Sequence, residues 1–161
     1  MAAEDVTERL IGKYGDMILR LCYTYLKSVP DAEDSAQDVF LKILEKLPEF
    51  NDEAHEKAWM IRVTINTCKS RLRSMKLRRA ASIDDIDIPV RDRYSDESGV
   101  LAAVLALPEK FRTVIHLYYY EGYSTPEIAR LTQRPEASVR SDLHRARKRL
   151  KAVLGGGYDF E

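Results

Sequence analysis

The chain has 161 residues, of which 45% are hydrophobic and 32% are charged, so it can build one ordinary core or two small ones. No apolar run approaches the roughly 18 residues of a membrane-spanning helix, and the acidic N-terminus lacks the basic-then-apolar order of a signal peptide. A cytoplasmic protein with no membrane insertion of its own is therefore expected.

The formal net charge is zero, from 26 basic and 26 acidic residues, but the charges are sorted along the chain. Residues 59–82 hold seven bases and no acid, whereas residues 83–100 hold six acids and two bases. Residues 101–161 are basic again, with ten bases against seven acids. Two basic segments separated by an acidic one indicate two contacts with a polyanion.

Helical periodicity dominates the first half of the chain, without the alternation typical of strands. A helix is expected over 6–28, ended by Pro30, and Asp31 is expected to cap the next one. That second helix is expected over 31–47, with an inner face of Ala36, Val39, Phe40, Ile43, Leu44 and Leu47. A third is expected over 53–79, with an inner stripe of Ile61, Ile65, Cys68 and Leu72.

The second half follows a break in this pattern. Residues 80–98 lose the periodicity and predict a flexible acidic linker, and residues 155–161 predict a loose tail. Between them, helices are expected at 99–107, 108–122, 125–132 and 136–153. The sequence therefore predicts an all-α protein with two small helical domains, 1–79 and 99–154.

The last two predicted helices have the spacing of a helix-turn-helix. Ser124 and Glu127 match a capping box, and residues 133–135 form a tight turn. The apolar residues of the second helix are expected to pack inward: Val139, Leu143, Ala146, Leu150 and Val153. Since such a helix presents its first turns to base edges, the expected DNA contacts are Ser138, Arg140, Ser141, Asp142 and Arg145. The later bases suit phosphates or solvent: Arg147, Lys148, Arg149 and Lys151.

A polar stripe on the third predicted helix is formed by Arg62, Asn66, Lys69 and Arg73, with Arg71, Lys76, Arg78 and Arg79 alongside. Such a stripe suits single-stranded or opened nucleic acid, and the alternative is a solvated basic face. Trp59 is either a stacking platform or a core anchor.

On the second predicted helix, Leu41 lies among Asp34, Asp38 and Glu45 at about 100° per residue. An apolar residue in an acidic patch is typical of a protein contact, although single exposed leucines are also ordinary.

The cysteines and histidines of the chain indicate neither a catalytic site nor a metal site. Cys22 and Cys68 fit small buried side chains, with a redox pair as the alternative. His55, His116 and His144 are isolated, and neither metal-ligand spacing nor a glycine-rich phosphate loop occurs. We expect no enzyme activity, cofactor or metal site. The rival binding function is an autonomous helix-turn-helix repressor or activator, which would read a palindrome as a homodimer.

Four segments occur in an order that resembles a known family: Asp31–Phe40, Ala58–Asn66, Leu107–Ile115 and Val139–Leu150. They resemble the extracytoplasmic-function (ECF) sigma factors of the sigma-70 superfamily, which retain only the second and fourth sigma regions. The likeness covers nearly all of 10–154. It implies a region 2 domain at 1–79 and a region 4 domain at 99–154, with no catalytic activity.

The resemblance also implies roles for particular residues. Six residues match the helix that grips the clamp coiled coil of the largest RNA polymerase subunit: Asp31, Glu33, Asp34, Gln37, Asp38 and Leu41. Asn66 and Lys69 match the segment that captures a flipped base of the minus-ten element. The C-terminal helix matches the reader of the minus-thirty-five element. Implied partners are core RNA polymerase, through its clamp and flap, promoter DNA, and an anti-sigma factor.

The chain departs from the family pattern around the turn. Thr132, Gln133 and Arg134 stand where Leu-Gly-aliphatic is common, and Ala137 replaces a turn glycine. Asp142 stands where a basic or neutral residue is frequent, and an acid there can accept a hydrogen bond from a cytosine amino group.

Overall fold

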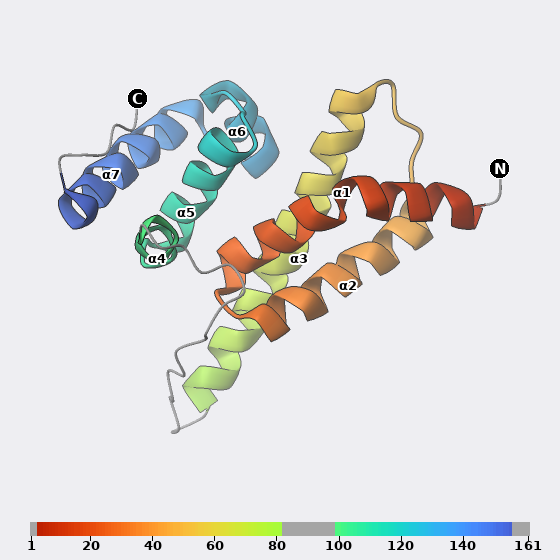
Figure 1. Cartoon of the computed structure of the whole chain (residues 1–161), viewed down its shortest axis with the longest axis horizontal. Coiled ribbons are helices and arrows are strands. Elements are labelled where there is room, and N and C mark those ends of the chain that lie inside the picture. Colours follow the sequence, from red (N-terminus) through yellow and green to blue (C-terminus); the bar gives the residue numbers. More distant parts are fainter. Residues whose placement is uncertain (1–2, 82–98, 156–161) are drawn as a thin grey trace. The chain divides into compact units, whose positions relative to one another are not determined.

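A computed structural model describes residues 3–81 and 99–155 of the chain (Figure 1). Every regular element within these residues is a helix, which confirms the all-α prediction. The chain divides into two compact units, Met1–Val90 and Arg91–Glu161. No described helix is both long and apolar enough to cross a membrane. Nearly all of the predicted linker and tail lies outside the described residues.

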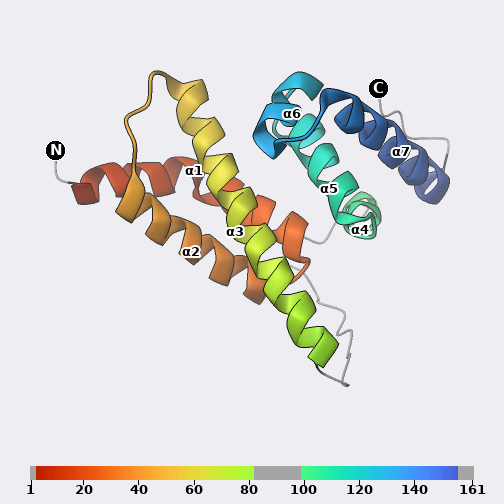
Figure 2. The same cartoon turned by 180° about the vertical axis from the view of Figure 1, so that it is seen from behind.

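The first unit is a bundle of α1 (Ala3–Leu26), α2 (Val29–Lys46) and α3 (Glu53–Ala81). In both views α1 and α2 lie side by side, and α3 packs against both (Figures 1 and 2). Side chains from all three helices form the fully buried core: Leu10, Ile18, Leu21, Val39, Ile43, Met60, Ile61 and Cys68. Cys22 is equally buried, and neither cysteine forms a disulfide, so both act as small apolar core residues.

The turn between α1 and α2 differs from the sequence-based expectation. Lys27 adopts a left-handed φ of 61° and donates its N–H to the carbonyl of Tyr23 at 2.8 Å, which ends α1. Ser28, rather than Asp31, caps α2, because its hydroxyl accepts from the Asp31 N–H at 3.3 Å. Pro30 lies in the first turn of α2, where its missing N–H costs nothing.

Glu56 ties the start of α3 to α1. Its nearly buried carboxylate accepts a 2.8 Å hydrogen bond from the Tyr14 hydroxyl and lies 3.4 Å from Lys13 and 3.6 Å from Arg9. Burial and the bond to Glu56 raise the pKa of Tyr14. Lys13 also contacts Glu53 at 2.8 Å, and this pairing lowers the pKa of Glu53. These contacts fix the direction in which α3 leaves the bundle.

The second unit contains α4 (Val100–Leu105), α5 (Glu109–Ile115), the π-helical turn η1 (His116–Tyr120), α6 (Thr125–Thr132) and α7 (Glu136–Leu154). Helices α4, α5 and α6 all pack on α7. Its apolar core is formed by Leu107, Phe111, Val114, Leu117, Ile128, Leu131, Val139, Leu143, Ala146 and Leu150. Gly122 follows η1 with a φ of 75°, which ends that helical segment where the sequence predicts it.

Two residues expected to face inward are instead exposed. Leu44 is 52% exposed on α2, because Ile43 and Val39 already occupy the side that meets α1 and α3. Val153 is 72% exposed at the last turn of α7, beyond the helices that cover the rest of its inner stripe.

Candidate nucleic-acid interfaces

One face of α3 carries the residues predicted to contact opened nucleic acid. Arg62, Asn66 and Arg73 are exposed and Lys69 is half-buried. At 100° per residue, these four positions lie within about 60° of one another around the helix axis. They form one continuous surface, called the α3 stripe below.

Arg71 was expected alongside this stripe, and the structure gives it a different position. It lies about 180° from Arg62 around the helix. Its guanidinium points to α2, where it pairs with Asp34 at 3.2 Å and with Asp31 at 3.4 Å. Lys76 and Arg78 remain exposed, and the Arg79 side chain lies outside the described residues. The helical angle alone could have separated Arg71 from the stripe, but it could not name the partners.

The polar face of α2, called the α2 face below, carries most of the residues implied by the family resemblance. Its exposed members are Glu33, Asp34, Gln37, Asp38 and Leu41. Asp31 is half-buried beside Arg71. Leu41 is 55% exposed, and Leu44, three residues further along the same helix, adds a second exposed leucine. Sequence reasoning missed Leu44 because it fitted the apolar stripe, yet its spacing from Leu41 was the available signal.

An aromatic group stands at the start of α3. The ring of Phe50 lies 5.3 Å from that of His55 and 5.7 Å from that of Trp59, both measured between centroids. Trp59 is half-buried, so it anchors the loop before α3 and keeps one part of its ring accessible.

The predicted capping box at the start of α6 is present. The Ser124 hydroxyl accepts from the Glu127 N–H at 3.3 Å, and Glu127 accepts from the Ser124 N–H at 3.0 Å. The hydrogen bonds that the Glu127 carboxylate accepts from the Ser124 N–H and from the Ser124 hydroxyl lower its pKa. At the other end of α6, Gln133 adopts a left-handed φ of 55°. Glycine adopts this backbone conformation without steric cost, so the position favours a glycine over Gln133.

Helix α7 presents most of its predicted DNA-contacting residues to solvent. Arg140, Ser141, Arg145 and Lys148 are exposed, and Ser138 is half-buried. Arg140 lies one turn after Glu136, with 3.8 Å between the guanidinium and the carboxylate.

Asp142 departs from the expectation that it contacts bases. It is 4% exposed, and its carboxylate forms an ion pair with Arg134, from the turn before α7. The carboxylate is therefore directed to the turn. We no longer expect Asp142 to contact a base.

Two later arginines of α7 rest on aromatic rings. Arg147 lies 5.2 Å from the ring centroid of Tyr118 and 5.6 Å from that of Tyr119, and its Nε donates to the Tyr119 hydroxyl at 2.6 Å. Arg149 lies 5.0 Å from the ring centroid of Phe111. Both guanidinium groups thus contact aromatic rings, a feature that the expectation of phosphate or solvent contact did not include.

Comparisons with known proteins agree with this two-unit arrangement. Residues 10–78 match the family profile of sigma-70 region 2, and residues 99–150 match that of sigma-70 region 4. The RNA polymerase sigma-H factor of Pseudomonas aeruginosa is 31% identical over 90% of this chain and 84% of its own length. The chain belongs to the sigma-70 family, and relatives that carry the ECF name, given in the next paragraph, show that it is an ECF sigma factor. As a member of that family, it directs RNA polymerase in transcription initiation.

Two further relatives carry the ECF name. The sigma factor SigM of Mycobacterium tuberculosis is 30% identical, with coverage of 92% of this chain and 76% of that protein. SigW of Bacillus subtilis is 28% identical, with coverage of 94% and 90%.

The fold is similar to those of two solved structures. The sigma factor RpoE from Bartonella quintana, solved with the anti-sigma factor NepR, matches with a TM-score of 0.75 at 22% identity, covering 91% of this chain and 95% of that one. CnrH, solved with the cytosolic domain of CnrY, matches with a TM-score of 0.64 at 22% identity, covering 94% and 88%.

Proposed function

We propose that this ECF sigma factor holds a promoter at two points while its α2 face binds core RNA polymerase. The observation that carries this proposal is the separation of three surfaces on one chain: the acidic α2 face, the basic α3 stripe and the exposed polar half of α7. A lone DNA-binding protein needs only the last of them. With no net charge, the chain relies on the polymerase for much of its affinity for DNA.

The α3 stripe is proposed to hold the melted strand of the minus-ten element. The exposed amide of Asn66 can donate to and accept from the edge of a flipped base. Arg62, Lys69 and Arg73 flank it and would neutralise neighbouring phosphates. These four residues form the proposed region 2 contact within residues 1–79.

The α2 face is proposed to bind the clamp coiled coil of the largest polymerase subunit. Two exposed leucines, Leu41 and Leu44, provide apolar contact area among exposed acids such as Asp34 and Asp38. Asp31 and Asp34 already interact with Arg71, whereas Asp38 has no ion-pair partner among the described residues and keeps its charge for the polymerase.

The second unit, within residues 99–154, is proposed to read the minus-thirty-five element and to contact the polymerase flap. Ser138, Arg140, Ser141 and Arg145 lie on the first half of α7, which enters the major groove in helix-turn-helix proteins. Lys148 lies further along the exposed side and suits a phosphate. No role in base readout is assigned to Asp142, since its carboxylate is buried.

We also propose that an anti-sigma factor regulates the protein and that it acts in the cytoplasm, where the polymerase works. The sigma factor RpoE, of similar fold, was solved with an anti-sigma factor, and CnrH, also of similar fold, was solved with a cytosolic partner domain. The proposal assigns the chain no catalytic step and no cofactor.

Run-off transcription with core polymerase and a promoter library tests the proposed function. We expect the protein to stimulate initiation from a subset of promoters that share two elements. The rival function, an autonomous repressor or activator, predicts tight operator binding by the protein alone. Specific operator binding without stimulation of transcription would exclude the promoter-selecting function.

A further inference from the structure

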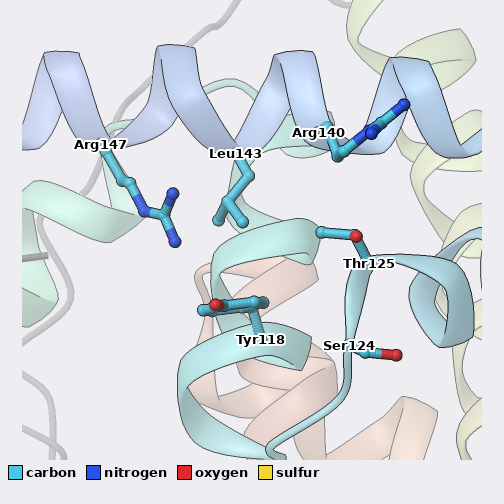
Figure 3. A pocket seen from close by; sticks show the side chains of 6 residues that line it. All are labelled: Tyr118, Ser124, Thr125, Arg140, Leu143 and Arg147. Atoms are coloured by element: carbon cyan, nitrogen blue, oxygen red, sulfur yellow. The ribbon is translucent and has the colours of Figure 1, made fainter. Parts of the chain in front are cut away.

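A hollow of about 450 Å³ opens on the second unit beside α7 (Figure 3). Its lining comes from η1, the start of α6 and the inner edge of α7: Tyr118, Ser124, Thr125, Arg140, Leu143 and Arg147. No carboxylate lines it, and two of its six lining residues are arginines. Its chemistry therefore suits an anion with oxygen atoms that accept hydrogen bonds.

Arg147 is oriented before any ligand arrives. The rings of Tyr118 and Tyr119 lie against its guanidinium, and its Nε is used by the Tyr119 hydroxyl. The side chain reaches from α7 toward Tyr118, into the space that Figure 3 displays. Within the described residues no carboxylate pairs with Arg147, so its terminal nitrogens keep their hydrogen-bonding capacity for a ligand.

The two arginines of the hollow do not act alike. Arg140 extends away from Arg147 along α7 and lies 3.8 Å from the carboxylate of Glu136. The Thr125 hydroxyl, at the same end, donates to Glu136 at 3.4 Å. An acid therefore adjoins the Arg140 end of the hollow, and the favourable end for an anion is the one at Arg147 and Tyr118.

We propose that Arg147 and the Tyr118 hydroxyl hold one backbone phosphate of the duplex at the upstream promoter element, with Tyr119 as the positioning residue for Arg147. The inference rests on the proposed function of the second unit. The hollow lies beside the start of α6 and the middle of α7, the parts of a helix-turn-helix that lie nearest the DNA backbone when the recognition helix enters the groove. A guanidinium fixed by two rings loses little conformational freedom on binding. Because phosphate contacts position a protein on the duplex, this contact would set how deeply α7 enters the groove.

A scan with methylphosphonate linkages, which replace single phosphates by neutral groups, tests the site in the reconstituted holoenzyme. Promoter duplexes with one neutral linkage each are compared for wild type, Arg147→Ala and Arg149→Ala. Arg149 is the matched control, because it is the same residue type, also stacked on a ring, and does not line the hollow.

For wild type we expect neutralisation of several linkages in the upstream element to weaken binding, and for Arg147→Ala no further loss at one of these linkages. Arg149→Ala is expected to remain sensitive there. Between 50 and 200 mM salt, the affinity of Arg147→Ala should fall by about threefold less than that of wild type, because one phosphate contact is missing.

Tyr119→Phe tests the positioning role, since it keeps the ring and removes the acceptor for Nε. We expect it to reduce the sensitivity at the same single linkage, an effect that general destabilisation would not produce. If neutralising each linkage reduced the binding affinity of Arg147→Ala and of wild type equally, the proposed phosphate site would be wrong. If wild-type holoenzyme still initiates at its promoter in that case, the proposed function stands; if it does not initiate, the proposed function fails independently.

Discussion

Arg134 and Asp142 form an ion pair that joins the turn between α6 and α7 to the second turn of α7. Asp142 is almost fully buried, whereas 27% of the Arg134 side chain is exposed. The pair therefore fixes the angle at which α7 leaves the turn. We therefore expect Asp142 to affect promoter reading through the orientation of α7 and not through contact with a base.

Asp142→Asn is expected to destabilise the protein by about 1–3 kcal/mol, because the half-buried guanidinium of Arg134 loses its charged partner. Urea unfolding measures this change. The double variant Arg134→Met with Asp142→Asn should recover part of the loss, since no unpaired charge remains. An altered base preference at the minus-thirty-five element, without any loss of stability, would return Asp142 to the base-contacting set.

Asn66→Ala is expected to slow strand opening by about tenfold while leaving holoenzyme assembly intact, because the exposed amide is proposed to bind a flipped base. Permanganate reactivity of the melted element reports opening, and fluorescence anisotropy with core polymerase reports assembly. Ser74→Ala provides the control, because it also truncates an exposed polar side chain of α3 but lies outside the α3 stripe. Equal effects of the two variants would argue against a specific role for Asn66.

Asp38→Arg is expected to weaken binding to core polymerase by about tenfold, because it reverses a charge at the centre of the α2 face. Asp38 has no ion-pair partner among the described residues, so its loss leaves the bundle undisturbed. Asp34→Arg should weaken binding too, but it also breaks the pair with Arg71.

Arg71→Gln separates the two effects at Asp34, since it removes the ion pair and keeps the carboxylate. We expect it to bind polymerase nearly as wild type does. Asp16→Arg, an exposed acid of α1, controls for charge reversal in general. Unchanged polymerase affinity for Asp38→Arg would exclude the α2 face as the clamp contact.

The stability of the second unit is expected to decline as the pH falls through the lowered pKa of Glu127. The ordinary value is 4.5, and the hydrogen bonds from Ser124 depress it in the folded state. A depressed carboxyl pKa contributes stability above the unfolded value, and this contribution disappears in acid. Thermal unfolding of wild type and Glu127→Gln between pH 7 and pH 3 should therefore converge at the acid end. A constant difference between the two would contradict the assignment.

Gln133→Gly is expected to stabilise the protein by up to about 1 kcal/mol, because glycine adopts the left-handed conformation at this position without steric cost. Gln133→Ala, which shortens the side chain and keeps the unfavourable φ, should give no such gain. Urea midpoints compare the three proteins. A lower midpoint for the glycine variant would show that the Gln133 side chain outweighs the strain.

The sequence by itself determined the features that depend on local spacing. The capping box at Ser124 and Glu127, the end of a helical segment at Gly122 and the exposure of Asn66 all follow from residues within a turn or two of each other. The apolar residues Val139 and Leu143 of α7 also pack inward as their spacing predicts.

Only the tertiary structure decided which surfaces meet and which charges find partners. Arg71 turns to α2 and Asp142 turns to Arg134, and neither pairing is encoded in the spacing of its own helix. Leu44 remains exposed because a bundle of three helices covers only one side of α2. Periodicity states which side of a helix is apolar, whereas the partner of a polar side chain depends on helices brought together from distant parts of the chain.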